Sequence, residues 1–309
     1  METATTAGML FQEDKRIMRE QTSIVDLLRS LSDLSVERAY DPYRTFEWPE
    51  SLPDNCLWMS RDLLSIDGTH YMDELSEEEL CRLSRWELVN FFSFNVHGIR
   101  ELMQQVLACI HNTGYEITSE YFHHFLDEEN KHMWFFAEFC KRYGGKIYFT
   151  QKVQFPTFAE EDIQSFLAFA KILISEQISD FYNVRMMNDD TLPPLVRKIN
   201  RVHHEDESRH LAMGRRVVAS MREELAKKYQ PEMLQKIGDY LRRYTEFFVQ
   251  SFYNPGTYRD AGFSEPYEIR RVLLQHPSRK TFHARALGKT SRFFESQGLF
   301  AGEISNVCN

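Results

Sequence analysis

The sequence lacks the features that mark secreted, membrane-spanning or nucleic-acid-binding proteins. Its five cysteines are scattered among 309 residues without a Cys-x-x-Cys pair, which predicts a reduced, cytoplasmic protein without cysteine-bound zinc or an iron–sulfur cluster. No stretch approaches the roughly 20 apolar residues of a transmembrane helix, and the N-terminus has no apolar signal-peptide segment. The formal net charge of −9 argues against a nucleic-acid partner.

The sequence does have the composition and periodicity of a globular, all-α protein. Hydrophobic residues make up 42% and aromatic residues 14% of the chain, and nothing in it is modular, so we expect a single domain over residues 1–309. Residues 1–20 are expected to be flexible, and residues 254–309 to form a mixed tail. A helical core over about 84–229 is predicted from four long periodic patterns. The predicted helices cover residues 84–111, 119–143, 160–187 and 195–229, followed by 231–253 and by short helices at 267–274 and 291–297.

Two Glu-x-x-His segments are the most informative motif. They pair Glu129 with His132 and Glu207 with His210. A Glu and a His three residues apart share one helix face, with Cβ atoms roughly 5–6 Å apart. Two such pairs, with a glutamate from each of two further helices, are the ligand set of a carboxylate-bridged di-metal site in a helix bundle.

An isolated glutamate precedes each segment by about one helix length, Glu101 before the first and Glu176 before the second. Glu129 and Glu176 lie among apolar residues at helical spacing, where a charged carboxylate is costly unless it is paired or binds a metal. A single Glu-x-x-His is ordinarily an exposed acid and a surface histidine, but two with apolar flanks favour a metal site. These ligand types suit iron or manganese, and zinc stays open on ligand type alone.

A third histidine makes the two segments unequal. His203 lies four residues before Glu207 and shares its helix face, although this spacing also fits an outer partner of the ligands. The whole pattern resembles the p-aminobenzoate N-oxygenase family of di-iron enzymes, in which the additional histidine is a third imidazole ligand. The resemblance covers about residues 101–210, with weaker similarity at 292–299. It implies a ferritin-like di-iron bundle with additional helices and seven metal ligands: Glu101, Glu129, His132, Glu176, His203, Glu207 and His210.

The resemblance also implies an activity, an O₂-dependent non-haem di-iron monooxygenase. The substrate would be a small-molecule or carrier-bound amine, usually an arylamine, taken through hydroxylamine towards nitroso or nitro in a biosynthetic pathway such as that of an antibiotic. Two iron ions (Fe²⁺/Fe³⁺) and O₂ would take part. Because no flavin or nicotinamide fingerprint is present, electrons would come from an external reductase or ferredoxin. Whether the protein forms a homodimer is left open.

Two other functions stay open at this stage. One is a C–H hydroxylase or desaturase built on the same site. The other is an iron- or manganese-binding protein without an organic substrate, which a closed bundle core would favour and a pocket beside the metals would oppose.

Several polar residues outside the motif are given lesser roles. Glu128 and Asp206 neighbour the ligands in sequence, but we expect their side chains to point elsewhere on their helices. Asp180 and His204 are interpreted as outer partners or simple polar neighbours. A set of basic residues in the tail could meet an anionic substrate or carrier, although a solvated face is the ordinary interpretation. This set is Arg279, Lys280, Arg285, Lys289 and Arg292.

Overall fold

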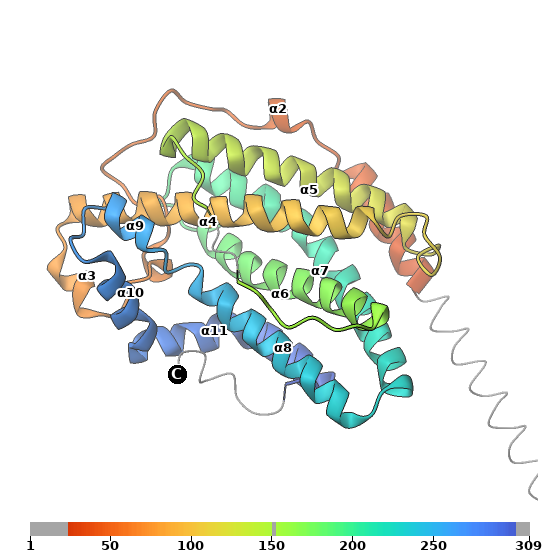
Figure 1. Cartoon of the computed structure of the whole chain (residues 1–309). Helices are drawn as coiled ribbons and strands as arrows, with labels where there is room; N and C mark the ends of the chain where they lie inside the picture. The colour runs from red at the N-terminus through yellow and green to blue at the C-terminus, as the bar shows by residue number, and fades with distance from the viewer. Residues whose placement is uncertain (1–23, 150–152, 301–309) are drawn as a thin grey trace, which may run out of the picture.

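The computed structural model describes residues 24–149 and 153–300, and it is built from helices (Figure 1). Within these residues there is no β-strand, which confirms the predicted all-α class. The segment predicted to be flexible, 1–20, lies outside the described residues. The central bundle consists of α4 (Glu77–Leu107), α5 (Ser119–Phe139), α6 (Glu161–Met187) and α7 (Pro194–Lys228). α4 packs mainly on α5, and α6 on α7, as two helical hairpins.

Local capping signals set where the α4–α5 hairpin begins and ends. Ser76 and Glu79 form a capping box: Glu79 N donates to Ser76 Oγ (3.3 Å), and Ser76 N donates to the Glu79 carboxylate (2.9 Å). α4 therefore begins at Glu77 and continues without a break through the pattern predicted from residue 84. At the other end, α5 passes into a π-helical turn, η2 (Cys140–Gly144), and stops at Gly145 with φ 67°. This left-handed glycine ends the helix, close to the predicted end at residue 143.

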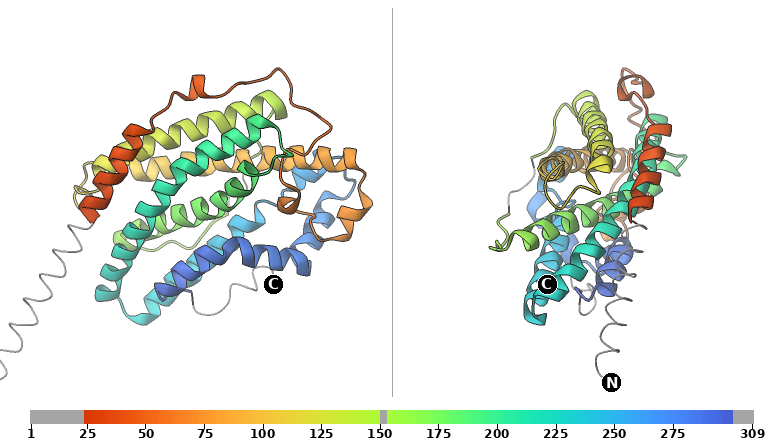
Figure 2. Two further views of the ribbon diagram at one scale, coloured as in Figure 1. Left: turned by 180° about the vertical axis from the view of Figure 1, so that it is seen from behind. Right: turned by 90° about the vertical axis from the view of Figure 1, so that its right-hand side faces the viewer.

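Up to residue 300, four further helices follow the bundle: α8 (Pro231–Gln250), α9 (Pro255–Asp260), α10 (Pro266–Gln275) and α11 (Pro277–Ser296). Each opens with a proline in its first turn, where the missing N–H has no intrahelical partner to lose. α8 and α11 pack against α6, and Figure 2 shows them gathered along that side of the bundle. The tail is therefore more helical than predicted.

The N-terminal part of the described chain wraps the opposite side. Residues 24–37 are helical, and the segment containing α2 (Pro42–Thr45) runs over α5 before the short elements η1 (Arg61–Leu63) and α3 (His70–Glu74). The middle of the bundle is consequently covered from both sides. Among the described residues, no helix is long and apolar enough to cross a membrane.

Candidate di-metal centre

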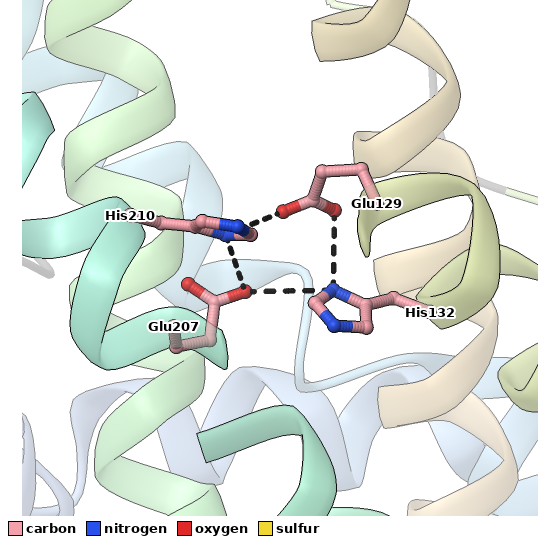
Figure 3. Close-up of side chains that lie close together, drawn as sticks. All are labelled: Glu129, His132, Glu207 and His210. Carbon is pink, nitrogen blue, oxygen red and sulfur yellow. Dashed lines mark ion pairs between the residues drawn. The ribbon is translucent and has the colours of Figure 1, made fainter. Parts of the chain in front are cut away.

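Four side chains from α5 and α7 meet in the middle of the bundle (Figure 3): Glu129, His132, Glu207 and His210. All four are buried, with at most 2% of their surface exposed, and one ligand atom of each lies within 4.8 Å of the others. Glu129 Oε1 is 2.9 Å from His210 Nδ1, and Glu129 Oε2 is 3.5 Å from His132 Nδ1. Glu207 Oε1 lies 3.9 Å from His132 Nδ1 and 3.7 Å from His210 Nδ1. Each carboxylate thus lies close to both imidazoles.

Glu176 from α6 and His203 from α7 extend this cluster. His203 Nε2 is 2.9 Å from Glu207 Oε1, while Asn183 Nδ2 donates to His203 Nδ1 (2.7 Å) and so orients the ring. Glu176 is buried and lines the same small cavity, of about 30 Å³, as Glu129, His203 and Glu207. The structure therefore brings six of the seven predicted residues together.

The structure does not bring Glu101 to this cavity. Glu101 is exposed on α4 and lines a neighbouring pocket of about 100 Å³ instead. Because successive residues of an α-helix are about 100° apart, Glu101 lies nearly opposite Ile99, which lines the metal cavity, whereas Leu102 lines both spaces. The expectation that Glu101 completes the carboxylate set has no support in this geometry.

Two acids that were expected to point elsewhere in fact hold the histidines, and this prediction was wrong. Glu128 and Asp206 are only 4% and 3% exposed. His210 Nε2 donates to Glu128 Oε2 (2.8 Å), and His132 Nε2 donates to Asp206 Oδ2 (2.9 Å). One residue before each ligand glutamate, these acids lie in the interface between α5 and α7 and not on a solvated face. Their hydrogen bonds aim both Nδ1 atoms at the centre of the cluster.

A buried arginine ties the two outer acids together. Arg209 is 4% exposed, and its Nη2 donates to both Glu128 Oε1 and Asp206 Oδ1 at 2.5 Å. The Tyr40 hydroxyl also donates to Asp206 (3.1 Å). Since each outer acid holds one histidine, Arg209 links the orientation of one imidazole to that of the other.

The inner atoms of the cluster have no hydrogen-bond partner among the described residues. These atoms are both carboxylate oxygens of Glu129, Nδ1 of His132 and of His210, Oε1 of Glu176 and Oε2 of Glu207. Buried polar atoms are normally hydrogen-bonded, so a group of unpartnered oxygens and imidazole nitrogens facing one point calls for a cation. The residues present therefore fit a di-metal cofactor.

The same groups shift one another's pKa strongly. Burial alone would lower the pKa of His132, but the carboxylates of Glu129 and Asp206 outweigh it and raise that pKa to about 9. Burial favours a protonated Glu129, yet the neighbouring His132 and His210 hold its pKa below the usual range. Burial, with the charge of Glu207, raises the pKa of Glu176 well above its ordinary value. Protons on the imidazoles thus balance the carboxylates until metal ions displace them.

A helix bundle whose core holds glutamates and histidines from facing helices defines a di-metal carboxylate protein of the ferritin-like class. Sequence comparison agrees: the profile of the P-aminobenzoate N-oxygenase AurF family matches residues 21–298. The chain belongs to this family and is an enzyme of the oxidase type. No curated protein matches the chain.

Solved structures with the same fold are variants of an R2-like ligand-binding oxidase. One, with an aerobically reconstituted Mn/Fe cofactor, is 14% identical over 90% of this chain and 93% of its own, with a TM-score of 0.54. Another such variant is 13% identical with the same coverage and TM-score. A third, anaerobically reconstituted, is 13% identical over 89% of this chain and 93% of its own, with a TM-score of 0.52. These likenesses confirm the ferritin-like fold.

Proposed function

We propose that this protein is an O₂-dependent di-metal monooxygenase that oxidises the nitrogen of a small amine, in particular an arylamine. The observation that carries the di-metal chemistry is the buried cluster of Glu129, His132, Glu207 and His210, which has unpartnered oxygens and nitrogens at its centre. Glu176 and His203 line the cavity beside it. The family to which the chain belongs supports nitrogen as the position of attack.

Six side chains would hold the two metal ions: Glu129, His132, Glu176, His203, Glu207 and His210. We propose two iron ions; the R2-like oxidases with a Mn/Fe cofactor make a mixed pair the alternative. When bound, the pair supplies electrons to O₂, and the outer hydrogen bonds of the imidazoles keep their Nδ1 atoms free for metal.

Pockets beside the cluster supply room for an organic substrate. The metal cavity shares one wall with the pocket of about 100 Å³ at Glu101. Phe94 also lines a third pocket, of about 120 Å³, and its ring meets that of Phe248 with centroids 4.6 Å apart. A Cβ at Gly98 would meet nothing within 4 Å, so the wall stays open there. An aromatic substrate can pack against these rings, which favours an enzyme over a storage protein.

The test supplies the reduced, iron-loaded protein with ¹⁸O₂ and a panel of anilines, including p-aminobenzoate. We expect close to two irons per chain and products that carry ¹⁸O on nitrogen. Products that carry ¹⁸O on carbon would instead indicate a C–H hydroxylase. Two bound irons that consume O₂ without changing any amine would refute amine oxidation. A Glu129→Gln variant, which loses a bridging carboxylate, is the control for metal-dependent turnover.

A further inference from the structure

The α4 wall of the metal cavity contains no carboxylate. Five residues of α4 line it: Phe94, Asn95, Gly98, Ile99 and Leu102. Only Asn95 among them has a side-chain oxygen. The other three bundle helices each present at least one glutamate to this cavity, so α4 differs from them in the kind of ligand it can offer.

Asn95 is a buried amide at this cavity. It is 7% exposed, and its Nδ2 donates to the Phe91 carbonyl oxygen one turn earlier (2.8 Å). This bond fixes the amide plane and leaves Oδ1 without a hydrogen bond from the described residues. We propose that Asn95 Oδ1 is the ligand that α4 supplies to the metal ion nearest that helix. Amide oxygens bind hard cations, although less strongly than carboxylates. This assignment rests on the proposed di-metal function.

The assignment changes the charge of the centre. Three glutamates face two divalent ions, so one positive charge stays uncompensated where a fourth carboxylate would neutralise it. The ion on the α4 side should therefore bind more weakly than its neighbour. Glu101, one helix face away, should have no effect on either ion.

The test measures Mn²⁺ binding by chelator competition for the full chain and three variants. We expect Asn95→Ala to weaken one of two equivalents by at least about tenfold, Asn95→Asp to tighten it, and Glu101→Gln to match the wild type. A structure of the Mn²⁺-loaded protein should show Asn95 Oδ1 bonded to metal. Unchanged binding in Asn95→Ala with unchanged melting of the apo protein would overturn the assignment, as would loss of one equivalent in Glu101→Gln. Failure of the wild type to bind two ions would instead refute the di-metal function.

A second, independent feature is a basic groove of about 460 Å³ between α6 and α11. Its walls include four cations: Arg185, Arg285, Lys289 and Arg292. Asp62 pairs with Arg185 (3.3 Å) and with Arg285 (3.5 Å), whereas Lys289 and Arg292 are exposed and make no ion pair with the described residues. This concentration of positive charge stands out on a chain of net charge −9.

The groove lies one helix away from the metal ligands. α6 directs Glu176 into the metal cavity and the next residue, Gln177, towards the groove. Gln177 is 4% exposed and its Nε2 has no acceptor among the described residues. Asp180 lines the groove and accepts a hydrogen bond from His204 Nδ1 (2.5 Å), the residue next to His203. Electrons entering here would have a short path to the metals.

We infer that this groove docks an acidic one-electron carrier. Oxidation of an amine to a hydroxylamine consumes O₂, two electrons and two protons and releases water, so two reduced carriers must be used per turnover. A basic groove attracts an acidic partner and raises its association rate. This inference also rests on the proposed function, because only a redox reaction needs the carrier.

The test follows reduction of the oxidised metal-loaded enzyme by an acidic [2Fe–2S] ferredoxin. We expect Lys289→Glu combined with Arg292→Glu to lower the second-order rate constant about tenfold at low salt and to remove its salt dependence. Lys236→Glu combined with Arg243→Glu, at two exposed sites on α8, is the charge-matched control. Dithionite should reduce every variant equally. Wild-type rates in the double variant would overturn the inference, as would an equal loss of reduction by dithionite.

Discussion

Removal of the charge of Arg209 should destabilise the metal-free protein. The guanidinium is buried and donates to Glu128 and Asp206, which are themselves buried. Arg209→Met keeps the apolar stem while it removes every donor. The change therefore tests the ion pairs with little loss of packing.

The size of this destabilisation follows from the buried charges that remain when Arg209 is replaced. Removing one partner of a buried ion pair costs about 3–5 kcal/mol, because the remaining charge has no compensation. Here His132 and His210 still donate to the two acids, so we expect a loss of about 3 kcal/mol, at the lower end of that range. For a protein of 309 residues, about 3 kcal/mol corresponds to a fall in melting temperature of roughly 5 °C.

Urea unfolding and thermal melting of the metal-free protein measure this loss. Arg44→Met is the control, since the Arg44 side chain is 88% exposed and lies 3.4 Å from Asp41. Such an exposed pair should contribute less than about 1 kcal/mol. If both variants lose the same stability, or if Arg209→Met loses none, the buried pairs have no net stabilising effect and the reasoning is refuted.

Three further predictions concern other parts of the molecule. Asp206→Asn keeps an acceptor for His132 but removes its charge, so metal affinity in chelator competition should fall by about 10–100-fold; equal affinity would contradict this role. Burial raises the pKa of Glu87 to about 7, so its stabilising contribution is present below its unfolded pKa near 4.5 and is lost as the pH rises through 7. The free energy of unfolding of the wild type, obtained from urea melts, should therefore fall over that window by up to about 3 kcal/mol more than that of Glu87→Gln; parallel pH curves would contradict this. At Gly238 a Cβ would lie 2.1 Å from the Leu299 carbonyl oxygen, so Gly238→Ala should lower the melting temperature through a loss of about 1–3 kcal/mol, and an unchanged melt would argue against that contact.

The helices of the bundle could be predicted because their signals are local. Apolar periodicity and caps such as Ser76 and Gly145 lie within one or two turns of the helix end that they determine. α11 could not be predicted in full, because its buried face includes Arg279 and Thr290. Arg279 is buried since its donors meet Tyr253 and Asp67, which are remote in sequence. A pattern that counts arginine as a surface residue cannot reveal this helix.

The same contrast between local signals and long-range packing applies to the candidate metal site. Residues three or four apart on one helix must share a face, so the grouping within α7 follows from spacing alone. Glu101 is different, because its position depends on how α4 is rotated against α5. That rotation is set by packing along the whole hairpin, and it directs Asn95 and Ile99 to the cavity while Glu101 faces a neighbouring pocket. The sequence spacing between residues on different helices predicts how far along the bundle axis each residue lies. It does not predict towards which neighbour its side chain points.

The repeated unit of this protein is longer than Glu-x-x-His. In both segments an acid stands directly before the glutamate, Glu128 in α5 and Asp206 in α7, and each binds the histidine of the other helix. The two units are therefore reciprocal: each helix contributes an inner carboxylate and an imidazole, and also fixes the imidazole of its partner. Arg209, inside the second unit, bridges the two acids and breaks the symmetry. A search for acid-Glu-x-x-His on two facing helices would have found these outer acids from sequence, since neither could stay buried without such a partner.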